Sequence, residues 1–162
     1  MIAGSEGIVR LLIENGAQVN AHVGHYGNAL QHAIVNQEDA IVKLLIENGA
    51  DVNTQGGRYG NALQAAIVAG SGDGIIEFLI DIGADVNCKG GEFGNILRAA
   101  CVHRDEYIVR LLLKNGAEVN GFQILDDLLE TAILQGEDAI VKLLMEEGDN
   151  IFDTLYTLSD VG

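Results

Sequence analysis

Apolar residues fall along this chain in a helical pattern that is followed each time by a glycine. Within IVKLLIENGADVN, Ile41, Leu44 and Leu45 stand at the i, i+3 and i+4 positions that place side chains on one face of a helix. We therefore predict a short amphipathic helix from about Ile41 to Asn48. Gly49 follows at the position where a left-handed C-terminal cap favours glycine, and Gly16, Gly83, Gly116 and Gly148 recur at the equivalent position of the other repeats.

The same segment returns at a nearly constant interval. Its leading isoleucines are spaced 33, 34, 33 and 32 residues apart, at Ile8, Ile41, Ile75, Ile108 and Ile140. A second block keeps the same register and occurs as YGNALQHA at 26–33, YGNALQAA at 59–66, FGNILRAA at 93–100 and LDDLLETA at 125–132. Two separate blocks at one period, over almost the whole chain, indicate internal repetition.

The second block predicts a second helix in every repeat. We call this helix the inner helix and the amphipathic helix that follows it the outer helix. Side chains of asparagine and aspartate cap helix N-termini by accepting early backbone N–H groups, and such residues stand at Asn28, Asn61, Asn95 and Asp127. Glycine-rich stretches such as VNTQGGRYG supply the turns between helix pairs. Because one helix pair cannot bury its own apolar face, the repeat predicts stacked pairs, an all-α solenoid of helix-turn-helix units with β-hairpin-like loops.

These motifs resemble those of the ankyrin repeats over roughly residues 1–151. The resemblance rests on the period, on the LL-x-x-GA-D-VN segment and on the two helices with a hairpin. Where ankyrin repeats usually have Thr-Pro-Leu-His, this chain has Asn-Ala-Leu-Gln at 28–31 and 61–64, and it contains no proline. The YGNALQAA form resembles the variant common in filamentous fungi. Asparagine can cap the helix as threonine does, but the interaction specific to the usual histidine does not carry over.

The repeat register divides the chain, which we interpret as a single domain over 1–162. Met1 aligns with Ile34, so we interpret 1–20 as a partial repeat and the chain as a piece of a longer one, or as a short product with unusual capping. Segment 121–151 lacks the glycine-rich hairpin, as a terminal capping repeat does. For the tail, packing of Phe152, Leu155 and Leu158 over the last helices and a frayed end are equally supported. The predicted full repeats are 21–53, 54–87 and 88–120, followed by the degenerate capping repeat 121–151 and the tail 152–162.

The resemblance also implies where a partner would bind, because ankyrin stacks bind through hairpin tips and exposed inner-helix positions on a concave face. Val35, Val68 and Val102 stand at equivalent positions of three successive repeats and would form an apolar strip on this face. Such a strip has the composition found at the centres of protein interfaces. The alternative is that these valines complete the core between helices. The implied concave-face residues are His25, Val35, Asn36, Asn48, Arg58, Val68, Ala69, Glu92, Val102, His103, Asn115, Ile124 and Gln135, with Leu134 beside the last.

Charge narrows the choice of partner. Aspartate and glutamate total 24 against 9 lysines and arginines, a formal charge of −15. This balance excludes a nucleic-acid ligand, whose phosphates need basic side chains, and disfavours an anionic membrane surface. No apolar run approaches the length of a membrane span, and the N-terminus lacks a signal-peptide pattern, so we predict a cytoplasmic protein, with the nucleus as the alternative.

Catalytic and metal chemistry find little support in the sequence. His22 and His25 lie close together on one hairpin, but two histidines are fewer ligands than a protein zinc site needs. His103, Asp105 and Glu106 resemble an acid–base cluster, yet they fall in a turn where a solvated, charged surface is expected. The glycine-rich segment 69–76 lacks the lysine of a phosphate-binding loop. We therefore predict no enzyme activity, no cofactor and no metal.

The two cysteines do not make a disulfide framework. Cys101 replaces the isoleucine found at Ile34 and Ile67, which predicts a buried thiol that packs as a small hydrophobic residue. Cys88 falls on a hairpin, where we expect exposure. A reactive thiol there would need a cationic neighbour, and Lys89 is a weak candidate.

These observations favour a protein–protein interaction module whose concave face binds a partner that carries a basic patch. One alternative is a structural or self-associating unit, joined end to end through the apolar surface of the open N-terminal repeat. The other is a small-molecule binder or atypical enzyme that uses the concave groove, which requires an enclosed pocket.

Overall fold

A computed structural model describes residues 2–22, 24–119 and 122–159, with side chains for 5–22, 24–119 and 124–148. The chain divides into two compact units, Met1–Ile96 and Leu97–Gly162. Helices account for most of both units. Helix pairs joined by short turns make up most of each unit, as the repeat in the sequence predicts.

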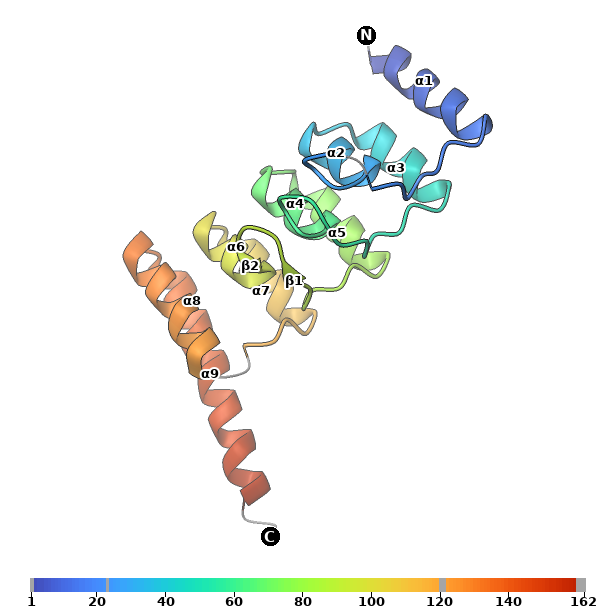
Figure 1. Cartoon of the computed structure of the whole chain (residues 1–162). Helices are drawn as coiled ribbons and strands as arrows, with labels where there is room; N and C mark the ends of the chain where they lie inside the picture. The colour runs from blue at the N-terminus through green and yellow to red at the C-terminus, as the bar shows by residue number, and fades with distance from the viewer. Residues whose placement is uncertain (1, 23, 120–121, 160–162) are drawn as a thin grey trace. The chain divides into compact units, whose positions relative to one another are not determined.

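The first unit contains five helices and one small hairpin among its described residues. Helix α2 packs against α3 and α4, α4 packs against α5, and α1 packs against α3 (Figure 1). The strands pair antiparallel, with Lys89 opposite Asn95, and an isolated bridge joins Gly56 to Gly60. The bounds are α1 (Ile2–Glu14), α2 (Ala29–Val35), α3 (Asp39–Glu47), α4 (Ala62–Val68), α5 (Asp73–Asp81), β1 (Lys89–Gly90) and β2 (Gly94–Asn95).

Asparagine caps open the inner helices α2 and α4, as the sequence predicts for Asn28 and Asn61. The Asn28 side chain accepts a hydrogen bond from the Gln31 N–H at 2.9 Å, and Gln31 Oε1 accepts one from the Asn28 N–H at 3.1 Å. This reciprocal arrangement satisfies two donors that the first helical turn leaves unpaired. In α4, Asn61 accepts in the same way from the Gln64 N–H at 2.7 Å.

The same glutamines also link consecutive repeats within the first unit. Gln31 is fully buried, and its Nε2 donates to the carbonyl oxygens of Gly56 at 3.2 Å and Gly60 at 3.3 Å. Gln64 is likewise buried, and its amide nitrogen donates to the Gly90 carbonyl of the following hairpin at 3.1 Å. Each glutamine thus connects its own helix to the hairpin of the following repeat, so the absence of the usual histidine does not leave this position without an inter-repeat bond.

A second link joins the loops that follow the outer helices. Asn20 Nδ2 donates to the Gly49 carbonyl at 2.9 Å, and Asn20 Oδ1 accepts from the Asp51 N–H at 2.8 Å. Asn53 repeats this pair of bonds with the Gly83 carbonyl, at 3.0 Å, and the Asp85 N–H, at 2.8 Å. The asparagine of the repeated Val-Asn motif therefore binds the corresponding loop of the next repeat through two hydrogen bonds.

The second unit contains most of α6 (Ile96–Val102), which begins at the last residue of the first unit, and α7 (Glu106–Lys114), α8 (Phe122–Gln135) and α9 (Asp138–Ser159). Helix α9 packs against both α7 and α8. Ile108, Leu112, Leu128, Ile140 and Leu144 are fully buried and form its core.

Two sequence predictions in the second unit are wrong. Asp127 was expected to cap a helix, but α8 begins at Phe122 and Asp127 lies within it. Gly148 was expected to end a helix, but α9 continues through it to Ser159. The physical reason is close packing, since a Cβ at Gly148 would lie 2.9 Å from Leu125 Cδ2. This glycine allows α8 and α9 to approach each other instead of terminating α9.

Residues 152–159 of the predicted tail fall in the last part of α9. Its backbone is helical through Ser159. The side chains of Phe152, Leu155 and Leu158 lie outside the described residues, so their packing stays a prediction, as do the repeat boundaries.

Candidate functional site

The hairpin tips predicted for the first unit lie next to one another. The Arg58 N–H donates to the His25 carbonyl at 3.0 Å, and the Glu92 N–H donates to the Arg58 carbonyl at 2.9 Å. Arg58 Nε also pairs with Glu92 Oε2 at 2.6 Å, although both side chains are about half exposed. These bonds bring together residues that the sequence separates by a full repeat each.

The ion pair at the tips shifts both partners toward their charged forms. The hydrogen bond from Arg58 holds the pKa of the Glu92 carboxyl below its ordinary value. The same bond, together with the negative charge of Glu92, raises the pKa of Arg58. Both groups therefore stay ionised across the physiological pH range.

Two tyrosines extend this surface. The rings of Tyr26 and Tyr59 stack with centroids 6.2 Å apart, and the Arg58 guanidinium lies 5.6 Å from the Tyr59 centroid. His25 contacts Tyr26 edge-on at 5.4 Å. We call His25, Tyr26, Arg58, Tyr59 and Glu92 the tip row. Sequence reasoning missed the tyrosines as site residues, although the Tyr-Gly pair that precedes both inner helices was a usable signal.

The inner-helix positions of the first unit are only partly covered. Val35 and Val68, the last residues of α2 and α4, are half-buried, as is Ala69 after α4. Asn36 is exposed, and its Nδ2 donates to the His32 carbonyl at 2.8 Å. The valines thus keep part of their surface accessible while also contributing to packing.

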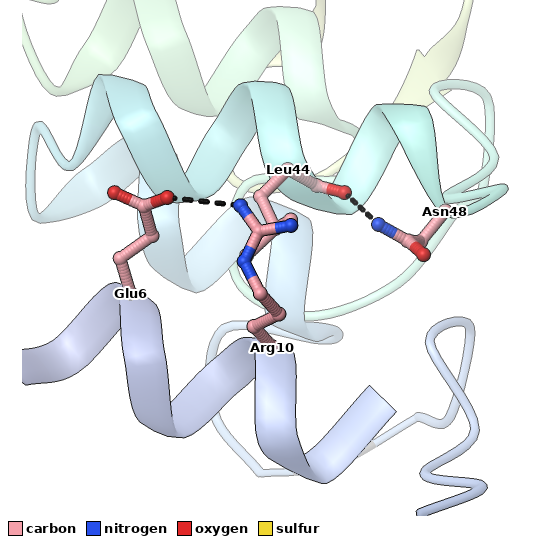
Figure 2. A network of polar contacts seen from close by, with 4 residues as sticks. All are labelled: Glu6, Arg10, Leu44 and Asn48. Atoms are coloured by element: carbon pink, nitrogen blue, oxygen red, sulfur yellow. Dashed lines mark hydrogen bonds and ion pairs between the residues drawn. The ribbon is translucent and has the colours of Figure 1, made fainter. Parts of the chain in front are cut away.

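The two candidate residues near the ends of outer helices, Asn48 and Asn115, form hydrogen bonds within the last turn of their own helices. Asn48 Nδ2 donates to the Leu44 carbonyl at 2.8 Å, one turn back in α3 (Figure 2), and Asn115 does the same with Leu111 in α7. Both side chains are exposed. Their amides therefore already have structural acceptors.

The candidate residues of the second unit are spread over three elements. Val102 ends α6 and is half-buried, and His103 beside it is exposed. Gln135 ends α8, and its Oε1 accepts from Arg104 Nε at 2.9 Å. Ile124 was predicted at a hairpin tip, but it lies half-buried within α8, because this repeat lacks the glycines that form the hairpin elsewhere.

In the acid–base cluster considered for His103, Asp105 and Glu106, both acidic side chains have structural roles. Asp105 caps α7 by accepting from the Ile108 N–H at 3.0 Å, and Glu106 pairs with Arg110 at 2.9 Å. His22 and His25 are exposed. Among the residues with described positions, no group of three histidine, cysteine or acidic side chains could hold a metal ion.

A groove of about 550 Å³ lies in the first unit, between α1 and the α2–α3 pair. Its walls include Val9 of α1, Ala29 and Ala33 of α2, and Ile41 and Leu45 of α3. Glu38 is the single carboxylate among the residues that line it. The groove is therefore chiefly apolar, and its polar lining includes His25, Tyr26 and His32 besides Glu38.

Both cysteines are buried. Burial raises the pKa of the Cys101 thiol to about 12, in agreement with the predicted buried position. The expectation that Cys88 is exposed is wrong: Cys88 is buried, and desolvation raises its pKa as well. Its Sγ donates to the Lys89 carbonyl at 3.8 Å.

These environments predict low thiol reactivity. The thiolate is the reactive form, so we expect the folded chain at pH 8 to react with a disulfide reagent at least ~10-fold more slowly than the urea-unfolded chain. Single-cysteine variants made with Cys101→Ala and Cys88→Ala separate the two sites, and Cys101 should be the slower. Equal rates for Cys101 in the folded and unfolded chains would contradict its burial.

In the described part of the chain, no helix combines the length and the apolar character needed to cross a membrane. No curated protein matches the chain. A family model described as ankyrin repeats, in three copies, matches residues 1–56 and 63–154. Together with the predominance of helices, this match confirms the predicted all-α ankyrin-repeat fold. The chain therefore belongs to the ankyrin-repeat family.

Proposed function

We propose that this chain binds a partner protein through the tip row and the partly covered ends of its inner helices. Ankyrin repeats are generally protein–protein interaction modules, and the family is typically non-enzymatic. The observation that carries the proposal is the continuous arrangement of His25, Arg58 and Glu92 by two backbone hydrogen bonds and one ion pair.

The tip row is suited to recognition because it is ordered before a partner arrives. Backbone bonds fix consecutive tips, and ring stacking restricts Tyr26 and Tyr59. A surface that is already ordered loses little conformational entropy on association, so more of the contact energy appears as affinity. Tyrosine and arginine are also the residue types that dominate binding energy at protein interfaces.

Val35 and Val68 add an apolar component beside these polar groups. Both are half-buried, which leaves surface that a partner could cover. We propose that Asn36, Asn48 and Ala69 border the same binding surface in the first unit. In the second unit we propose corresponding roles for Val102, His103, Asn115, Ile124 and Gln135.

The charge of the chain indicates the kind of partner. With a formal charge of −15, the protein attracts a basic protein surface over several ångströms and raises the rate of encounter more than the final affinity. Residues 121–162 contain ten acids and one lysine, so the steering charge is strongest toward the C-terminus. We propose a partner with a basic patch and a cytoplasmic setting.

Affinity purification with wild-type and variant chains tests this function. Arg58→Glu reverses the charge at the centre of the tip row, and Val68→Glu places a charge beside it. Arg110→Glu is a matched control, because Arg110 is also an exposed arginine paired with a glutamate but lies on outer helix α7. Circular dichroism confirms that each variant is folded.

We expect Arg58→Glu to weaken capture of the specific partner at least ~10-fold, the typical effect of removing a central interface arginine, and Arg110→Glu to leave capture unchanged. Capture should also decline as salt rises from 50 to 300 mM, about a halving of the screening length. Identical partner lists from the wild-type chain and from the folded Arg58→Glu and Val68→Glu variants would show that this surface does not bind the partner.

A further inference from the structure

Helix α8 exposes acidic and large apolar side chains on one face. Asp126, Asp127 and Glu130 are exposed, and Ile133 and Leu134 are 62% and 78% exposed. At 3.6 residues per turn, these five positions lie within about one third of the helix circumference. We call these five residues the α8 face. Helix α8 packs against α9 with its other side, where Leu128 and Ala132 are fully buried (Figure 1).

The acidic and the apolar groups occupy different ends of the α8 face. Asp126 and Asp127 precede Ile133 and Leu134 by two helical turns, about 10 Å along the axis, and Glu130 lies between them. Helix α8 contains no lysine, arginine or histidine. Among the residues whose side chains the structure describes, none of the three acids forms an ion pair. The acids therefore present uncompensated negative charge beside exposed apolar surface.

The corresponding positions of α4 are covered. In repeat register Glu130 and Ile133 stand where α4 has Gln64 and Ile67, which are 2% and 4% exposed. The next hairpin covers Gln64, whose amide nitrogen donates to the Gly90 carbonyl. An ionised glutamate has no N–H to donate and repels a carbonyl oxygen. The α8 face therefore lacks the donor by which an inner helix of this chain binds the hairpin of another repeat.

A surface that covers the α8 face must combine cations with apolar side chains. A carboxylate loses its hydration on burial, and a lysine or arginine compensates this loss by charge-assisted hydrogen bonds. Ile133 and Leu134 are stabilised by apolar contacts that remove them from water. A second copy of the chain is poorly suited, because it also carries a formal charge of −15. Charge complementarity therefore favours a basic amphipathic partner.

We propose that the α8 face is a docking site for a basic amphipathic helix of a partner protein. Two large apolar side chains of that helix cover Ile133 and Leu134, and its lysines or arginines, two turns away on the same side, pair with Asp126, Asp127 and Glu130. The docking site lies in the second unit and does not depend on the tip row. Failure of either proposal therefore leaves the other in place.

A synthetic peptide tests this recognition motif. The probe is an alanine-rich helix of about 18 residues, long enough to be partly helical in water. It carries two leucines and, two turns away on the same side, three lysines. One control peptide has the three lysines on the opposite side of the helix, and the other has glutamates in their place. Fluorescence anisotropy of the labelled peptides measures their binding to the full chain.

We expect the probe to bind at least ~10-fold more tightly than either control peptide, because only the probe aligns both kinds of side chain with the α8 face. Its binding should weaken as salt rises from 50 to 300 mM, because exposed charge pairs are screened. Equal binding of the probe and the peptide with displaced lysines, or no binding of the probe, would overturn the proposal.

Substitutions at exposed positions locate the bound probe. Leu134→Ser should weaken probe binding at least ~5-fold, and Glu130→Gln should weaken it ~3-fold and reduce its salt dependence. Leu11→Ser on α1 and Glu47→Gln on α3 are matched controls, because both residues are exposed in the first unit. They should leave probe binding unchanged. Probe binding that Leu134→Ser leaves intact would place the peptide elsewhere and overturn the proposal.

Sedimentation over a concentration series examines the competing occupant, a second copy of the chain. The proposal expects Leu134→Ser to leave the sedimentation coefficient unchanged at every concentration. A wild-type dimer that Leu134→Ser dissociates, while Leu11→Ser does not, would assign the α8 face to self-association and overturn the proposed occupant.

Discussion

Replacing Gln31 by leucine should destabilise the protein by about 3 kcal/mol, although the new side chain is apolar and of similar size. The reason is the set of partners left behind. Gln31 Oε1 accepts from the Asn28 N–H, and Nε2 donates to the Gly56 and Gly60 carbonyls. The Gly60 carbonyl keeps its bond from the Gly56 N–H at 2.7 Å. The Asn28 N–H and the Gly56 carbonyl each lose this partner, and an unsatisfied buried polar group costs about 1–3 kcal/mol.

Urea denaturation followed by circular dichroism measures this loss. Gln55→Leu is the matched control: the same substitution at an exposed position of the following hairpin, where we expect a change within about 0.5 kcal/mol. If Gln31→Leu unfolds at the same urea concentration as Gln55→Leu, the glutamine does not link the repeats energetically.

Gly57→Ala should lower the free energy of unfolding by a similar amount, roughly 3 kcal/mol or more, for two additive reasons. Gly57 has φ +65°, a conformation that costs an L-residue about 1–2 kcal/mol. An added Cβ would also meet the backbone of the preceding hairpin, at the Tyr26 carbonyl and at the Gly27 nitrogen, 2.5 Å away. Backbone atoms cannot rotate aside as a side chain can, so the two hairpins must separate.

The control for this substitution isolates the conformational cost. Gly49 has φ +86°, but an added Cβ would find no atom within 4 Å. Gly49→Ala should therefore cost about 1 kcal/mol, the price of positive φ alone. The difference between the two variants, measured by thermal or urea unfolding, reports hairpin-to-hairpin contact. A Gly57→Ala variant as stable as Gly49→Ala would show that the hairpins separate at little cost.

Separation of the hairpins would also disturb the candidate site. The Arg58 N–H bonds to the His25 carbonyl directly after Gly57. Gly57→Ala should therefore weaken partner capture as well as stability, whereas Gly49→Ala should affect stability alone. The tip row and the fold thus depend on the same glycine.

The local features of this protein follow from its sequence. Spacing of apolar residues gives the outer helices to within about two residues, as in α3, and Asn28 and Asn61 cap their helices as predicted. The glycines after the first four outer helices, Gly16, Gly49, Gly83 and Gly116, all adopt positive φ as expected for such caps. These features depend on residues within one or two helical turns of one another, which a single pass along the sequence can evaluate.

Longer-range features escaped sequence reasoning or were wrongly predicted. The stacking of Tyr26 on Tyr59 and the inter-repeat bonds of Gln31 and Asn53 depend on residues about 25 to 34 positions away. Gly148 has the sequence context of a helix end but serves close packing against Leu125. A glycine fits both roles equally well, so its neighbours in space decide between them.

The repeat in the sequence by itself determined the alternation of helix pairs, the helix caps at Asn28 and Asn61, and the family. The tertiary structure alone decided which identical side chains are covered. Ile8 and Ile41 have nearly the same local sequence, yet Ile8 is 61% exposed and Ile41 lies in the core. Burial depends on the helix that packs against a residue, and in a stack of repeats that helix comes from a distant part of the chain.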